Sequence, residues 1–311
     1  GPDPAPEADQ SLIAFPRIDL PVAIDLRRLG TDRLRLGPAV AGQETLLRVT
    51  GAAEATRQGR LDLTLDVQRK NGVGGALKAG ILADPRDQTL DLVLEGAEPQ
   101  GGIIAGLLGA PGAPPTTVTL AGDGTLDAWS GTVSATIGTD IATDLDLSLA
   151  VLPNLAITVK GNVVPGPLGP ADAAGYVGET VALDLAAALS PERAVDVERL
   201  TVSLAAGRLE AKGALSPEGI VAGRLGFMTG PGLVLPEPYN VGAASLTAAV
   251  DGPMGSPSIT VVATATDPKI QDSRIDPLLA GTSRLEALLS PSLTAGTVDI
   301  EDLRFTSDVI E

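Results

Sequence analysis

The sequence predicts an all-β protein: an elongated antiparallel meander, curved or folded over into a U-shaped trough with an apolar interior and one or two short helices. Apolar and polar residues alternate with a period of two in many short runs, which sends them to opposite faces of a sheet. Gly, Pro, Asn and Asp separate these runs, as expected for tight turns. About sixteen candidate strands result, too many for a flat open sheet, so the sheet is expected to curve.

The clearest strands lie between Arg60 and Glu95. Residues 61–67, 77–83 and 90–95 alternate apolar and polar side chains in three successive runs. The segments 71–75 and 84–87 between them are rich in turn residues. Gly72-Val73-Gly74 therefore predicts a hairpin turn, since a dinucleotide-binding fingerprint would need a third glycine.

Upstream, residues 15–22 from Phe15 to Val22 carry prolines typical of an edge strand, and residues 29–36 and 44–52 add two alternating runs. Downstream, residues 101–115 break the alternation because their apolar residues have helical spacing and end in a Pro-rich segment. A short helix is expected near 102–109. It would either plug the end of the apolar face or act as a membrane-facing lid.

The rest of the chain returns to alternation. Strands are expected at residues 118–120, 133–137, 145–149, 155–159, 181–185, 200–204, 209–215, 221–227, 246–250 and 259–265. The leucines of residues 276–289, which are Leu278, Leu279, Leu285, Leu288 and Leu289, predict a second short helix from about Ser283 or a loop.

The expected organisation has four parts. Residues 1–14 are a linker or tag remnant, and residues 15–161 form a first β-meander. A Pro- and Gly-rich connection, 162–175, leads to a second meander, 176–311, that continues the same sheet. Gly1-Pro2 resembles the scar of a cleaved tag, so the chain is interpreted as a fragment of a longer protein.

Composition narrows the classes of function. The 22 basic and 39 acidic residues give a net charge of −17, which disfavours nucleic-acid partners. The chain has no Cys or His, which removes disulfides, thiolate chemistry and the usual zinc ligands. Only 2% of residues are aromatic, so an interior would be lined by short aliphatic side chains. A GC-rich genome explains this bias equally well.

The fate of the apolar face decides the function. A curved sheet would leave a long hydrophobic groove, whereas two halves pressed together about 10 Å apart would make a dry sandwich. The low aromatic content and the strand number favour the groove. Its lining candidates are Leu61, Leu63, Leu65, Val67, Leu77, Ile81, Leu90, Leu92, Leu94, Val118, Leu120, Val133, Ile137, Leu145, Leu147, Leu149, Leu155, Ile157, Val159, Leu200, Val202 and Leu204.

We expect no enzyme, no cofactor and no metal site. The sequence contains neither a phosphate-binding P-loop nor a Gly-x-Ser-x-Gly nucleophile motif. Asp62 with Asp66, and Asp144 with Asp146, could form paired carboxylates for acid–base chemistry or calcium binding. Because they alternate with leucines on predicted strands, a solvated outer face is the favoured interpretation.

Several segments carry a resemblance to a known family. They are residues 16–21, 32–37, 51–53, 101–109 with Pro114 and Pro115, 122–131, and 251–259. In this order they resemble the N-terminal half of the TamB branch of the AsmA-like family of bridge-like lipid-transfer proteins. The resemblance covers most of the chain, and the last segment is similar to a strand opener that recurs in the family.

The resemblance implies a periplasmic protein of a Gram-negative bacterium, anchored in the inner membrane and extended as a folded-over sheet, a β-taco. It would carry phospholipids between the inner and outer membranes. In the family, a C-terminal region outside this sequence meets an outer-membrane Omp85-type partner, TamA, in a translocation and assembly module. Two alternatives remain: an assembly factor for outer-membrane β-barrels or autotransporters that acts by strand addition, and a structural β-sandwich spacer.

Overall fold

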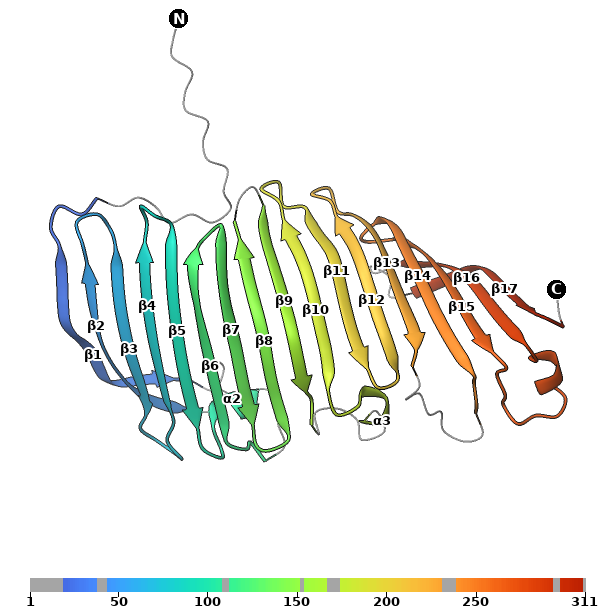
Figure 1. Cartoon of the computed structure of the whole chain (residues 1–311), viewed down its shortest axis with the longest axis horizontal. Coiled ribbons are helices and arrows are strands. Elements are labelled where there is room, and N and C mark those ends of the chain that lie inside the picture. The colour runs from blue at the N-terminus through green and yellow to red at the C-terminus, as the bar shows by residue number, and fades with distance from the viewer. Residues whose placement is uncertain are drawn as a thin grey trace, which may run out of the picture. The chain divides into compact units, whose positions relative to one another are not determined.

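The computed structural model describes residues 19–37, 44–107, 112–151, 154–166, 174–230, 239–292 and 297–309. These residues form seventeen strands in one antiparallel meander sheet, which is not closed (Figure 1). The predicted all-β meander is therefore confirmed. By its internal contacts the chain divides into two compact units, Gly1–Gly161 and Asn162–Glu311, which are described in turn.

The first unit is a meander of nine strands with one short helix, α2 (Ile103–Leu107). Its strands are β1 (Ile24–Leu36), β2 (Thr45–Ala55), β3 (Leu61–Arg69), β4 (Ala76–Asp84), β5 (Thr89–Glu98), β6 (Thr116–Thr125), β7 (Ala128–Ile137), β8 (Ile141–Ala150) and β9 (Leu155–Val164). Each lies antiparallel beside its neighbours in sequence. The alternating runs predicted from residue 61 onward are strands. Gly72 and Gly74 lie in the turn between β3 and β4 with φ angles of 70° and 86°.

The register gives this unit one apolar and one polar face. Because side chains alternate along each strand, residues directly opposite each other across the sheet share a face. One apolar row is Leu63, Ile81, Leu92, Gly122, Gly131 and Leu147. A polar row on the other face is Thr50, Asp66, Lys78, Glu95, Thr119, Ser134 and Asp144.

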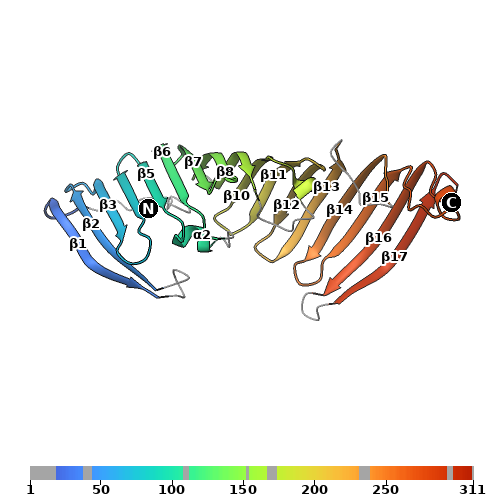
Figure 2. The same ribbon diagram turned by 90° about the horizontal axis from the view of Figure 1, so that it is seen from below.

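The helix α2 covers one end of the apolar face. Its Ala105 is fully buried and clusters with Ile137 at the end of β7, beside Ala113 and Ile141. At the helix start, the backbone N–H of Ile104 donates to Oε2 of Glu98 over 2.8 Å. Figure 2 shows α2 on one side of β6 and β7. The helix expected near 102–109 is thus present over Ile103–Leu107, and positions 108 and 109 lie outside the described residues.

The second unit is a meander of eight strands with two short helical turns, α3 (Ala174–Val177) and the 3₁₀ turn η2 (Asp276–Leu278). Its strands are β10 (Val181–Leu189), β11 (Val195–Leu204), β12 (Gly207–Leu215), β13 (Ile220–Thr229), β14 (Ala243–Pro253), β15 (Ser258–Thr266), β16 (Thr282–Ser292) and β17 (Thr297–Ser307). The register again separates two faces. One apolar row is Leu200, Ala211, Leu225, Ala248, Val261, Ala287 and Leu303.

Two expectations differ from the structure. The helix or loop predicted from Ser283 is wrong, because β16 occupies Thr282–Ser292. Leu285 pairs there with Phe305 of β17. In the expected edge strand Phe15–Val22, residues 15–18 lie outside the described residues and residues 19–22 form no strand, so β1 begins only at Ile24.

Candidate functional site

The predicted lining residues lie on a common face within each unit. The cross-strand register joins those of β3 to β8 into shared rows on the apolar face. In β9, the Thr158 hydroxyl bonds to that of Ser148 on the polar face of β8. Ile157 and Val159 therefore point to the opposite, apolar face, as does Leu155. In the second unit, Leu200, Val202 and Leu204 pair with the apolar-face residues of β12.

Few of these side chains are buried, although they are strongly apolar. Of the 22 candidates, Ile137 is buried, Ile157 is 40% exposed, and the remaining twenty are half-buried. Leucine and valine side chains in a closed core are usually fully buried. The apolar faces therefore keep part of their hydrocarbon surface in contact with solvent.

Within each unit, the extensive contacts of a strand are those with its neighbours in the sheet. The described strands of a unit thus make a single layer. Three apolar residues of β17 are mostly exposed: Val298, Ile300 and Leu303 are 60%, 64% and 60% exposed. A dry sandwich would need a second sheet against the apolar face, and among the described residues no such sheet packs there.

The apolar face of the second unit is hollowed in two places. One hollow of about 570 Å³ lies over β11 to β15, and its lining includes Leu200, Leu225 and Val250. A second, of about 420 Å³, lies over β13 to β17 between Phe227 and Phe305. Both have sizes typical of small-molecule sites, roughly 300–1,000 Å³.

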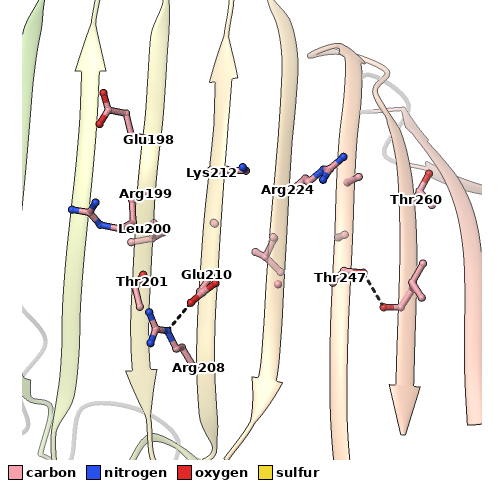
Figure 3. Close-up of a pocket in the computed structure, with 16 residues that line it drawn as sticks. Glu198, Arg199, Leu200, Thr201, Arg208, Glu210, Lys212, Arg224, Thr247 and Thr260 are labelled. Carbon is pink, nitrogen blue, oxygen red and sulfur yellow. Dashed lines mark hydrogen bonds and ion pairs between the residues drawn. The ribbon is translucent and has the colours of Figure 1, made fainter. Parts of the chain in front are cut away.

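The polar face of the second unit has a hollow of about 600 Å³ with mixed charges (Figure 3). Four basic and two acidic side chains line it, a net charge of +2 in a chain of −17. Nε of Arg208 lies 2.7 Å from Oε1 of Glu210. Lys212 and Arg224 stand directly opposite each other on β12 and β13. Figure 3 shows their side chains without a dashed contact to an acidic partner.

The suggested carboxylate pairs lie on the polar face of the first unit. Asp62, Asp144 and Asp146 are exposed, and Asp66 stands opposite Lys78 of β4. Among the residues that the structure describes, no group of three or more His, Cys, Asp or Glu side chains is placed to hold a metal ion.

Two exposed carboxylates in the second unit have perturbed acidity. The pKa of Glu192 is lowered by its own backbone N–H and by the Ser190 hydroxyl. The pKa of Glu218 is lowered by the Ser216 hydroxyl and by its own backbone N–H. Both residues lie in tight turns, between β10 and β11 and between β12 and β13. These hydrogen bonds stabilise the geometry of the two turns.

Part of the hollowed face was not predicted from the sequence. The apolar residues of β12 to β15 were expected in strands, but none was named as a lining residue, although Val221, Leu225, Val250 and Ile259 line the larger hollow. The alternation of these residues with polar or small residues would have identified them as lining residues. No structural role was predicted for Trp129, which is 7% exposed on the apolar face of β7.

Two further observations concern the class of protein to which this chain belongs. Within the described residues, no helix has the length and apolar character needed to cross a membrane. Comparisons with protein-family models, with curated proteins and with solved structures found no match for this chain.

Proposed function

We propose that this chain is a segment of a bridge-like lipid-transfer protein that carries phospholipid acyl chains along a hydrophobic groove. The supporting observation is the apolar face of each unit, which is continuous in register over successive strands yet only half-buried. Curvature of the sheet into a trough would enclose that face around the acyl chains, and the headgroups would remain in water.

The physical reason for such a route is the cost of exposing hydrocarbon to water. Each methylene that leaves an apolar environment costs about 0.8 kcal/mol, so a lipid tail crosses water slowly. A continuous apolar face replaces that water at every step. No single residue carries the process, because the lining leucines, valines and isoleucines act together.

The proposal includes the setting that the resemblance implies. The full-length protein would lie in the periplasm, anchored to the inner membrane, and would meet an outer-membrane Omp85-type partner, TamA, through a region outside this sequence. Phospholipids are its cargo, and it is not an enzyme.

The test places a charge on the apolar face and compares it with the same change on the neighbouring residue of the other face. Leu92 lies in the apolar row of β5, whereas Val93 lies on the polar face and is exposed. In transfer of a pyrene-labelled phospholipid between vesicles, Leu92→Asp should lower the rate about tenfold, because a carboxylate against hydrocarbon costs well over 1.4 kcal/mol. Val93→Asp should leave it unchanged.

Circular dichroism identifies variants that keep the wild-type fold. Leu63→Asp and Leu147→Asp lie in the same register row as Leu92 and should repeat its effect. A folded Leu92→Asp protein that transfers lipid at the wild-type rate would contradict the proposal.

A second candidate is an assembly factor that binds unfolded outer-membrane strands by β-augmentation. The observation in its favour is β17, where Val298, Ile300 and Leu303 are 60%, 64% and 60% exposed. Strand addition to a sheet edge would place the apolar side chains of a substrate strand against such residues. Crosslinks from Ile300 to a barrel substrate, without lipid transfer, would select this function.

A further inference from the structure

Each unit has a pair of glycines that face each other on its apolar face. Gly122 of β6 faces Gly131 of β7, and Gly213 of β12 faces Gly223 of β13. A Cβ added to Gly131 would lie 3.0 Å from the Cα of Gly122, and one added to Gly213 would lie 2.9 Å from the Cα of Gly223. The two hairpins therefore present the same gap, in which two side chains are missing from the face.

In the first unit the gap is filled by the ring of Trp129, two residues before Gly131. A Cβ at Gly122 would lie 2.7 Å from Cη2 of the ring, and one at Gly131 would lie 2.6 Å from the same atom. Aromatic rings laid over glycines are a known way of completing a β-sheet surface. Trp129 is 7% exposed, so the ring itself is covered.

In the second unit the gap is open. Val221 holds the position that corresponds to Trp129, two residues before Gly223 on the same face, and its short side chain does not reach the glycines as the Trp129 ring does. A Cβ at Gly223 would meet backbone atoms of Lys212 and Gly213 and one methyl of Val250, at 3.1–3.4 Å. This gap is part of the 570 Å³ hollow, whose other walls include Val197, Leu200, Leu215, Leu225 and Ile259.

The backbone pairing and the side chains of the hollow indicate what kind of molecule it can bind. β12 and β13 are hydrogen-bonded to strands on both sides, so their backbone groups are already paired and cannot bind an added peptide strand. The side chains that reach the hollow from the apolar face are aliphatic and carry no polar group. An occupant gains only burial of its own hydrocarbon, which favours an aliphatic chain without polar groups.

We propose that the hollow over Gly213 and Gly223 binds the aliphatic chain of a lipid, and that Trp129 is a built-in occupant of the corresponding site over Gly122 and Gly131. This inference rests on the proposed lipid-transfer function and refines it. The apolar face then has one defined site for an aliphatic chain at β12 and β13, whereas the glycine pair in the first unit is covered by the protein's own side chain.

The test substitutes, in separate variants, the two residues that distinguish the sites. Val221→Trp should lay an indole over Gly213 and Gly223, and Trp129→Leu should open the gap over Gly122 and Gly131. With palmitate as the probe, titration calorimetry should show binding about tenfold weaker for Val221→Trp, the loss expected when about two methylenes stay in water. Trp129→Leu should bind one equivalent of palmitate more than the wild type.

Matched variants separate these effects from damage to the fold. Val221→Leu keeps an aliphatic side chain and should weaken binding much less than Val221→Trp does. Trp129→Phe keeps a ring and should bind no more palmitate than the wild type. Thermal melting checks each protein. Leu215 stands opposite Val221 where Gly124 stands opposite Trp129, so Val221→Phe, with a smaller ring, replaces Val221→Trp if that protein does not fold.

The outcomes distinguish this inference from the function on which it rests. If the wild type binds neither palmitate nor a phospholipid, both proposals fail. If it binds them but Val221→Trp and Val221→Phe bind equally well and Trp129→Leu gains no site, the subsite assignment fails and lipid binding stands. A phosphatidylethanolamine titration sensitive to Val221→Trp supports the site with phospholipid as the source of the chain, and sensitivity for palmitate alone supports it with a free fatty acid.

Discussion

The two units build their apolar faces from the same alternation and close them differently. Among the described residues, the first unit buries Leu126, Trp129, Ile137 and Val151 along with two alanines, whereas the buried apolar residues of the second unit are Ala186 and Ala206. The helix α2 and the indole of Trp129 account for much of the cover in the first unit. Alternation therefore decides which side chains share a face, and a few bulky groups decide how much of that face stays open.

The polar faces differ as well. Lys78 in the first unit stands between Asp66 and Glu95, an arrangement in which cross-strand charges attract. Lys212 in the second unit stands opposite Arg224, where they repel. The two units thus share an apolar face, whereas the charges on their polar faces follow no common pattern.

The largest expected effect tests the filled and open glycine pairs. Gly122→Ala would drive a methyl group into the ring of Trp129, so it should lower the free energy of unfolding by about 1–3 kcal/mol, as overpacking does. Gly223→Ala meets no ring, and alanine also removes glycine's flexibility in the unfolded chain, so the change should stay within about 1 kcal/mol. Urea unfolding followed by circular dichroism measures both.

Two further glycines serve as controls for this comparison. A Cβ added at Gly80 in the first unit or at Gly226 in the second would meet no heavy atom within 4 Å. Alanine at either place should leave stability unchanged or slightly raised. Equal costs for Gly122→Ala and Gly223→Ala would show that the two sites do not differ as described.

The smallest expected effect tests the polar faces. Arg224→Glu turns the repulsion with Lys212 into attraction and should raise stability by about 0.2–1 kcal/mol. Lys78→Glu places three carboxylates in one row with Asp66 and Glu95 and should lower stability by a similar amount. Both changes should shrink in 1 M salt, where charges are screened within about 3 Å. Salt-independent effects in chemical unfolding would point to packing instead.

The strands were predictable from sequence because a period of two is a direct consequence of the extended backbone. Residues 61–67 and 77–83, for example, fall in β3 and β4 with the expected side chains on one face. The predicted helix from Ser283 failed because Leu285, Leu288 and Leu289 mimic helical spacing. In β16, Leu288 lies on the polar face opposite Asp302, and Leu285 faces Phe305.

The openness of the face was not predictable in the same way. Alternation carries no information about sheet curvature, which depends on twist summed over many strands. Nor does it show that Trp129 covers a glycine pair, because that depends on which residue faces Gly131 across the hairpin. The signal in the sequence is a glycine at an apolar-face position on each of two successive strands. The residue two positions before the second glycine then distinguishes the sites: it is Trp in the filled site and Val in the open one.

The most direct test of the central claim is native mass spectrometry of the purified protein, with extraction and identification of any bound lipid. If the apolar faces form a lipid-carrying groove, phospholipids should co-purify with the wild type and be lost when Leu63 or Leu147 is replaced by Asp. A lipid-free wild-type protein that unfolds cooperatively and takes up no phospholipid from vesicles would contradict the claim.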